Sequence, residues 1–155
     1  MNQLSNPIVV EQTFNSKVSK VWDAITNPDE MRQWFFNNIP SFVPKVGFET
    51  EFIVQSESRS FEHLWKLIEV IPNKKIKYSW SYKNIKGEGF VTFELFTINE
   101  QTLLRLTNEG LESFPKDIPE FSRESCETGW KYFIKERLKT YLKSKKHLIN
   151  EHCKS

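Results

Sequence analysis

The hydrophobic residues follow two different periods along the chain, and these predict where helices and strands lie. Residues 8–14 are rich in Ile, Val and Phe, which is typical of a β-strand. Over residues 18–25, Val, Val, Trp and Ile recur at i, i+3, i+4 and i+7, the spacing of one apolar helix face. A second short helix is expected from Pro28, with Asn27 as its N-cap and Glu30 where a capping box places a carboxylate.

From residue 48 onward the period becomes two, which predicts a series of strands with one buried face. These strands lie around residues 48–55, 61–70, 76–82, 91–95 and 104–106. Gly87 and Gly89 indicate a turn between the third and fourth of them, and Asn99-Glu100 indicates a tight hairpin before the last. Consecutive strands joined by short turns favour an antiparallel sheet.

The C-terminal third returns to helical spacing and predicts one long helix. This helix is expected to begin between Asp117 and Ser125, and no proline interrupts residues 120–155. Its apolar stripe comprises Trp130, Phe133, Ile134, Leu138, Tyr141 and Leu142. Gly129 lies inside the helix at a cost of ~1 kcal/mol relative to Ala. It indicates a close approach of another backbone, a break in the helix, or simple tolerance of the glycine.

This order of elements defines an α+β fold with one strand, two short helices, five further strands and a long helix. A chain of 155 residues is expected to form a single domain over 1–155. At this length a protein can bury ~70% of its unfolded surface without the help of a metal or a disulfide. Aromatic residues make up 14% of the chain, and such bulky side chains either fill a core or line a hollow one.

Composition excludes several classes of protein. The net charge of +2 argues neither for nor against nucleic acid, but the basic residues come without an interleaved recognition motif, so we expect no nucleic-acid partner. Cys126 and Cys153 are far apart and no Cys/His spacing resembles a zinc site, which suits a reducing compartment. We find no signal peptide and no run of ~20 apolar residues. A cytoplasmic protein without integral membrane association, metal or cofactor is expected.

Charge is unevenly distributed around the predicted long helix. Residues 109–127 hold six acids and two bases, whereas residues 131–146 hold seven bases and one acid. This order complements a helix macrodipole, with negative charge at the start and positive charge at the end. A solvated helix face explains it most simply, and an acidic protein partner or an anionic membrane surface are the alternatives.

The residues that carry a family resemblance are spread over most of the chain. They are residues 21–28 with Met31 and Trp34-Phe35, residues 69–72, Ile76, Tyr78 and Trp80, Gly89 with residues 91–95, residues 102–106, and Gly129-Trp130. Together they resemble the helix-grip fold of the START-like, or SRPBCC, superfamily, in which a curved six-stranded antiparallel sheet wraps around a long C-terminal helix. The closer resemblance, over residues 8–142, is to the domain named after the activator of the heat-shock protein 90 ATPase, in its single-domain bacterial form.

The resemblance implies a ligand cavity between the sheet and the long helix. The residues expected to line it are Trp34, Phe36, Phe52, His63, Trp65, Tyr78, Trp80, Phe93, Trp130 and Phe133. Ordinary core packing is the alternative for each of them, because cores and apolar pockets share one composition.

Polar residues on the predicted strands leave further alternatives open. His63 shares a strand face with Phe61 and Trp65, where it is either a satisfied core histidine or a ligand contact. Glu94 and Arg105 lie on neighbouring strands, where they form either an exposed cross-strand ion pair or a buried anchor for a ligand headgroup.

Three functions are compatible with these features. The first is the binding of a small apolar or amphipathic ligand, such as a lipid, an isoprenoid or an aromatic compound, by a carrier or sensor. The second is an enzyme of the cyclase, aromatase or hydrolase kind, although no nucleophile elbow, phosphate loop or zinc-protease motif is present. Its candidate acid-base groups are His63, Tyr78, Tyr82, Glu94 and Arg105. The third is an interaction module that activates a chaperone ATPase or binds another protein partner, with a homodimer also possible.

Overall fold

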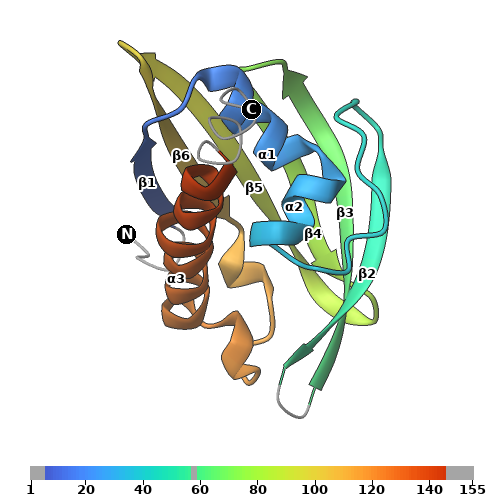
Figure 1. Cartoon of the computed structure of the whole chain (residues 1–155). Helices are drawn as coiled ribbons and strands as arrows, with labels where there is room; N and C mark the ends of the chain where they lie inside the picture. Colours follow the sequence, from blue (N-terminus) through green and yellow to red (C-terminus); the bar gives the residue numbers. More distant parts are fainter. Residues whose placement is uncertain (1–5, 57–58, 146–155) are drawn as a thin grey trace.

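The computed structural model describes residues 6–56 and 59–145, and it contains a six-stranded antiparallel sheet curved around the helices (Figure 1). The strands are β1 (Ile8–Phe14), β2 (Glu49–Ser56), β3 (Arg59–Ile71), β4 (Lys75–Tyr82), β5 (Ile85–Ile98) and β6 (Gln101–Glu109). They are ordered β1-β6-β5-β4-β3-β2, so β1 and β2 form the two edges. The predicted α+β helix-grip fold is confirmed. Cys153 lies outside the described residues.

Two short helices and one long helix lie on the concave side of the sheet (Figure 1). The short ones are α1 (Val18–Thr26) and α2 (Pro28–Trp34), as the sequence predicts. The long helix comprises residues 123–145: α3 (Arg123–Lys131), the π-helical segment η4 (Tyr132–Leu138) and a final helical stretch. Two short 3-10 helices, η2 (Leu111–Ser113) and η3 (Pro119–Phe121), connect β6 to it.

The joint between α1 and α2 is capped as expected, with one difference. Asn27 is the N-cap, its side-chain oxygen accepts the Asp29 N–H at 2.9 Å, and Pro28 occupies the first helical position. The predicted capping box is wrong because the Glu30 carboxylate turns toward the long helix instead. It accepts hydrogen bonds from the Tyr141 hydroxyl at 2.9 Å and from the Lys145 ammonium group. Glu30 therefore ties α2 to the end of the long helix.

The glycines of β5 do not form the turn that the sequence predicts. The turn lies at residues 83–84, where Asn84 adopts a positive φ of 64°, and Gly87 and Gly89 lie within the strand. The segment after β6 packs directly on them. A Cβ atom at Gly87 would lie 2.7 Å from both the Phe114 ring and the Ser113 carbonyl oxygen. The missing side chains therefore allow a close approach of backbone, which is the other common role of glycine in a strand.

The long helix departs from regular α-helical geometry where it crosses the sheet. Its buried residues Trp130, Ile134, Leu138 and Leu142 recur every four positions. In a regular α-helix such a stripe would drift by ~40° at each step. The wider turns of the π-helical segment, between Tyr132 and Leu138, compensate for this drift and keep the stripe on the sheet.

Gly129 neither breaks the long helix nor touches another backbone. The helix runs through it without interruption, and a Cβ atom added there would meet nothing within 4 Å. The expectation of a break or of a close backbone approach is therefore wrong, and the glycine faces open space.

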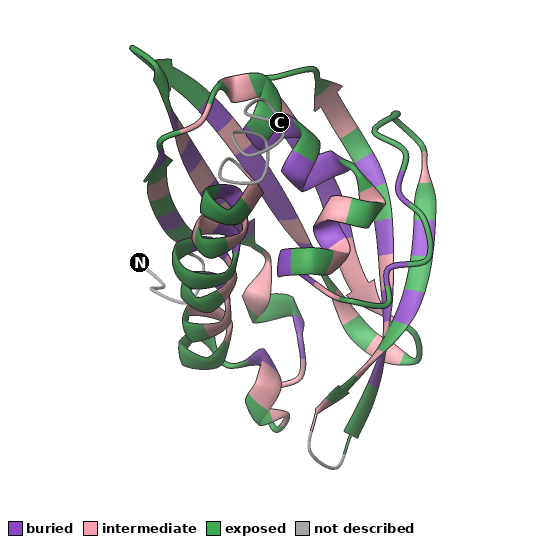
Figure 2. Ribbon diagram, viewed as in Figure 1, coloured by how far each residue is buried: buried purple, intermediate pink, exposed green. Residues whose placement is uncertain are grey.

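The buried residues lie where the sheet faces the helices (Figure 2), and the core combines aliphatic side chains with ten large aromatic ones. Trp34, Trp65, Tyr78 and Phe93 are fully buried. The Trp34 indole N–H donates to the Ala24 carbonyl at 2.8 Å, but neither the Trp65 indole N–H nor the Tyr78 hydroxyl has a partner within the described part of the chain. Burial also raises the pKa of Tyr78 well above its ordinary value. Such unpaired groups cost stability.

Replacing Tyr78 with Phe removes a buried hydroxyl without a partner, so we expect the free energy of unfolding to rise by about 1 kcal/mol. The matched control is Tyr141→Phe, which removes a hydroxyl bonded to Glu30 and should lower stability by about the same amount. Urea unfolding of the three proteins measures both changes. A loss of stability in the Tyr78 variant would show that its hydroxyl has a partner.

Candidate functional site

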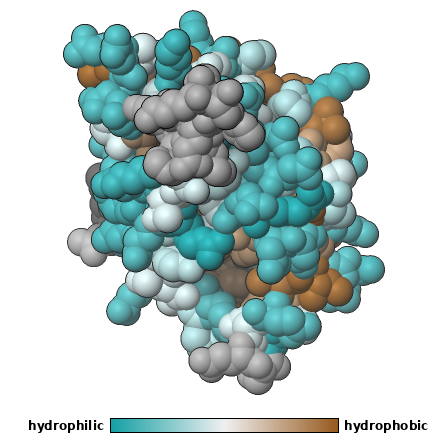
Figure 3. Space-filling model, in the orientation of Figure 1, coloured by the Kyte–Doolittle hydropathy of each residue, from teal (hydrophilic) through white to brown (hydrophobic). Residues whose placement is uncertain are grey.

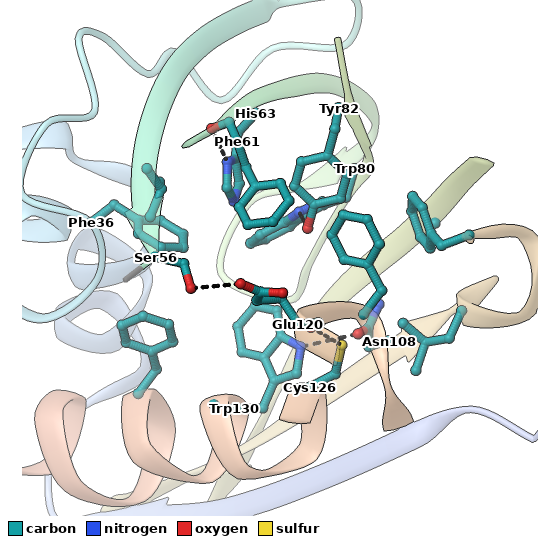
Figure 4. A pocket seen from close by; sticks show the side chains of 17 residues that line it. Phe36, Ser56, Phe61, His63, Trp80, Tyr82, Asn108, Glu120, Cys126 and Trp130 are labelled. Atoms are coloured by element: carbon teal, nitrogen blue, oxygen red, sulfur yellow. Dashed lines mark hydrogen bonds between the residues drawn. The ribbon is translucent and has the colours of Figure 1, made fainter. Parts of the chain in front are cut away.

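A cavity of about 210 Å³ lies between the concave face of the sheet and the long helix (Figure 4). On the molecular surface a hydrophobic hollow opens among hydrophilic residues (Figure 3). The cavity is lined by Phe36, Val54, Ser56, Phe61, His63, Trp80, Tyr82, Gly89, Asn108, Leu111, Phe114, Glu120, Phe121, Cys126, Gly129, Trp130 and Phe133. The walls are therefore mostly aromatic, with a few polar groups from separate strands.

The residues that follow α2 form one wall of the cavity. The helix stops at Trp34, and the next two residues both turn toward the interior. Phe35 stacks on Trp34 with ring centroids 4.7 Å apart. Phe36 lies over the cavity, with its ring centroid 5.2 Å from that of Phe133 and 5.3 Å from that of His63. Phe36 thus joins the long helix to the sheet.

The segment between β6 and the long helix closes the opposite end with a small aromatic cluster. Phe61, Phe114 and Phe121 are buried together, apart from the main core. Tyr82 joins them, because its ring stacks on Phe121 with centroids 4.7 Å apart. The close approach permitted by Gly87 holds Phe114 against β5. This end of the cavity therefore depends on η2 and η3 staying against the sheet.

His63 lies in the cavity wall as a buried, uncharged imidazole. Its Nδ1 is 3.1 Å from the Phe61 carbonyl oxygen. Aromatic rings surround it, with centroids at 5.2 Å for Phe52, 5.4 Å for Trp80 and 4.8 Å for Tyr82. Burial lowers the pKa of His63 to about 4, outweighing the hydrogen bond to Phe61, which acts in the opposite direction. The imidazole is therefore neutral at physiological pH.

The other polar groups of the interior are also uncharged. The Trp80 indole N–H donates to the Tyr82 hydroxyl at 2.8 Å, and the Trp130 indole N–H donates to Asn108 Oδ1 at 3.1 Å. Burial raises the pKa of Tyr82, and it raises that of the Cys126 thiol to about 11. At neutral pH the inner wall therefore presents dipoles rather than charges.

One charged residue, Glu120, lies at the rim of the cavity. Its Oε2 accepts a hydrogen bond from the Ser56 hydroxyl at 2.8 Å, and its Oε1 lies 3.3 Å from Arg59 Nε in an ion pair. The Ser56 hydrogen bond is the main cause of a lowered pKa at Glu120. These contacts join η3 to the ends of β2 and β3. The negative charge of the carboxylate is balanced by the positive charge of Arg59.

The ten residues expected to line a cavity fall into two groups. Phe36, His63, Trp80, Trp130 and Phe133 line the observed space. Trp34, Phe52, Trp65, Tyr78 and Phe93 are buried in the packed core instead. Whether any of the first group binds a ligand remains a prediction.

Several lining residues were not among the expected ones. Ser56 and Asn108 come from strand ends, Glu120 from the segment before the long helix, and Cys126 from its first turns. Phe61 carried a usable signal, because it shares the alternating face of His63 and Trp65 on β3. The remaining lining residues could be recognised only from the fold, which places η3 and α3 beside the sheet.

The fold brings only two of the candidate acid-base residues together: His63 and Tyr82 lie beside each other in the cavity wall, whereas Tyr78 is in the packed core. Arg105 bonds Glu11 through its Nε at 2.6 Å and packs over Phe96, and both partners of this ion pair are exposed. The alternative of a buried Glu94–Arg105 anchor for a headgroup is therefore wrong, because Arg105 pairs across to β1 on the outer face. Within the described residues no group of three or more His, Cys, Asp or Glu side chains is placed to hold a metal ion.

The curved sheet, the long helix and the cavity between them define the class of helix-grip proteins. Within this class, the family described as activator of Hsp90 ATPase homolog 1-like protein matches residues 15–143, and the chain belongs to it.

Several solved structures share this fold. A protein of Chromobacterium violaceum is 20% identical with a TM-score of 0.71, and the match covers 87% of this chain and 95% of that one. DynU16, from the dynemicin biosynthetic locus, is 22% identical with a TM-score of 0.71, covering 89% of this chain and 47% of DynU16. The Aha1 dimer from Colwellia psychrerythraea is 22% identical with a TM-score of 0.62, covering 83% and 90% of the two chains. No match was found among proteins with curated functions.

None of the helices in the described part of the chain is both long enough and apolar enough to cross a membrane.

The buried imidazole makes stability depend on pH. The pKa of His63 is 6.5 when unfolded and about 4 when folded, so between these values the unfolded chain binds a proton that the folded chain does not. Stability therefore falls as the pH decreases. We expect this group to remove about 2 kcal/mol from the free energy of unfolding between about pH 7.5 and about pH 5. Urea unfolding of the wild type and of His63→Phe measures it. An equal pH dependence in both proteins would contradict the assignment.

Proposed function

We propose that this protein binds a small apolar or amphipathic molecule in the cavity and serves as a carrier or sensor for it. The observation that carries the proposal is the aromatic-lined space of about 210 Å³ with uncharged polar groups in its wall. An apolar cavity of roughly 150 Å³ is large enough to bind benzene, so this space suits one or two rings or a short chain. DynU16 comes from a biosynthetic locus for a small molecule, which is compatible with such a role.

The expected affinity for simple probes is weak. Burying about 200 Å² of apolar ligand surface contributes about 5 kcal/mol at 25 cal/mol per Å². Loss of translational and rotational freedom offsets part of this gain. The full gain of about 5 kcal/mol corresponds to a dissociation constant of about 0.2 mM, so simple probes are expected to bind in the millimolar range, and a better-matched ligand would bind more tightly.

Catalysis on a bound molecule is a second candidate, favoured by one observation. His63 and Tyr82 both line the cavity, with ring centroids 4.8 Å apart. The lowered pKa of His63 makes it a weak base, and the raised pKa of Tyr82 makes it a weak acid at neutral pH. Binding therefore explains the site with fewer requirements than catalysis.

Gly129 allows a sharp test of the binding role, because its missing side chain leaves open space in the cavity wall. We expect Gly129→Leu to fill the cavity and abolish binding, while stability stays equal or rises by about 1 kcal/mol through better helix propensity. Thr128→Leu makes a similar change at the neighbouring exposed position and is the control. Native mass spectrometry of freshly purified proteins, followed by organic extraction, identifies any bound molecule.

The expected result is a mass adduct in the wild type and the Thr128 variant that is absent from the Gly129 variant. An adduct of equal occupancy in all three proteins would place the ligand elsewhere. Clean masses in all three, together with no change in melting temperature across lipids, isoprenoids and aromatics, would count against a binding function.

A further inference from the structure

The cavity wall contains a hydrogen-bond acceptor and a hydrogen-bond donor that lie beside each other. His63 supplies the acceptor. Its Nδ1 faces the Phe61 carbonyl at 3.1 Å, and because a carbonyl oxygen can only accept, Nδ1 carries the proton of the neutral ring. Nε2 is then an unprotonated acceptor. In Figure 4 this second ring nitrogen points into the cavity, and no hydrogen bond to it is found within residues 6–56 and 59–145.

Tyr82 supplies the donor. Its hydroxyl oxygen accepts the Trp80 indole N–H at 2.8 Å, so the hydroxyl proton is left to be donated elsewhere. The part of the chain that the structure describes offers it no acceptor at hydrogen-bond distance. The rings of His63 and Tyr82 are nearly perpendicular, at 80°, with centroids 4.8 Å apart. In Figure 4 the second ring nitrogen of His63 and the Tyr82 hydroxyl both point toward the cavity, so a single hydroxyl group on a ligand can be placed against both residues.

The same wall offers no positive charge to an anionic ligand. None of the lining residues is Lys or Arg, and the imidazole of His63 stays neutral above about pH 4. Glu120, at the rim, is already engaged with Ser56 and Arg59. A carboxylate or phosphate brought into this aromatic space would lose its hydration without a counter-charge, which is strongly unfavourable.

We propose that the molecule bound here is a neutral hydroxylated aromatic compound, whose hydroxyl donates to His63 Nε2 and accepts from the Tyr82 hydroxyl. This assignment rests on the binding function proposed above and names the chemical class of its ligand. The aromatic body would lie among Phe36, Trp80, Trp130 and Phe133. A phenol satisfies both unpaired groups at once, whereas a plain hydrocarbon leaves them unpaired.

Three probes of one shape test the proposal: 2-naphthol, naphthalene and 2-naphthoate, titrated by ligand-observed NMR against the purified protein near neutral pH. We expect 2-naphthol to bind about tenfold more tightly than naphthalene, the effect of one to two well-made hydrogen bonds. The carboxylate should bind more weakly than either. Equal affinities for 2-naphthol and naphthalene would overturn the proposed class but leave the binding function standing.

The other outcomes are equally informative. Tightest binding of 2-naphthoate would overturn the proposal by showing that the site carries a positive charge. No binding of any probe would overturn it together with the wider binding function for ring compounds.

Two variants assign the preference to its residues. In His63→Phe and in Tyr82→Phe the ratio of the two affinities should fall toward one. Tyr132→Phe removes a hydroxyl from an exposed position of the same protein and should leave the ratio unchanged. The ratio of the affinities for 2-naphthol and naphthalene is decisive, because a collapsed cavity would weaken the binding of both neutral probes alike. A ratio that survives both cavity variants would overturn the roles assigned to His63 and Tyr82.

Discussion

The width of the sheet is the constraint on which the rest of the structure depends. Six strands spaced about 4.8 Å apart form a surface roughly 24 Å wide, whereas one helix with its side chains is about 10 Å wide. The long helix alone therefore cannot cover the apolar concave face. Helices α1 and α2 cover one further part of it, and the segment carrying η2 and η3 covers another. The cavity lies where these coverings meet.

Which segment packs over an aromatic side chain, rather than its residue type, decides whether that side chain fills the core or lines the cavity. Tyr78 and Trp80 are two positions apart on β4 and share one face of the sheet. Tyr78 lies in the packed core, where Phe42 contacts it with centroids 5.9 Å apart. Trp80 lies farther along the same strand, beyond this packing, and lines the cavity. Two residues with the same pattern in the sequence thus take different roles.

The sequence predicts the fold well because the fold depends on local periodicity. The alternation of residues 76–82 is the alternation of β4, and the Asn27-Pro28 joint is the observed boundary between α1 and α2. Where the sequence misleads, a long-range contact is the reason. Gly87 leaves room for Phe114, which comes from a later segment, and Glu30 accepts a hydrogen bond from Tyr141 near the end of the long helix. Only half of the residues expected to line the cavity do so, because the extent of the cavity depends on such long-range contacts.

The π-helical segment divides the long helix into two parts that face different regions of the interior. Ahead of it, Trp130 faces the cavity, and behind it Leu142 packs in the core. A π turn holds one more residue than the α turn it replaces. If the same residues followed regular α winding, the twelve steps from Trp130 to Leu142 would rotate the first part against the second by ~120°. The winding of this segment, more than any one side chain in it, therefore sets which face of the helix points into the cavity.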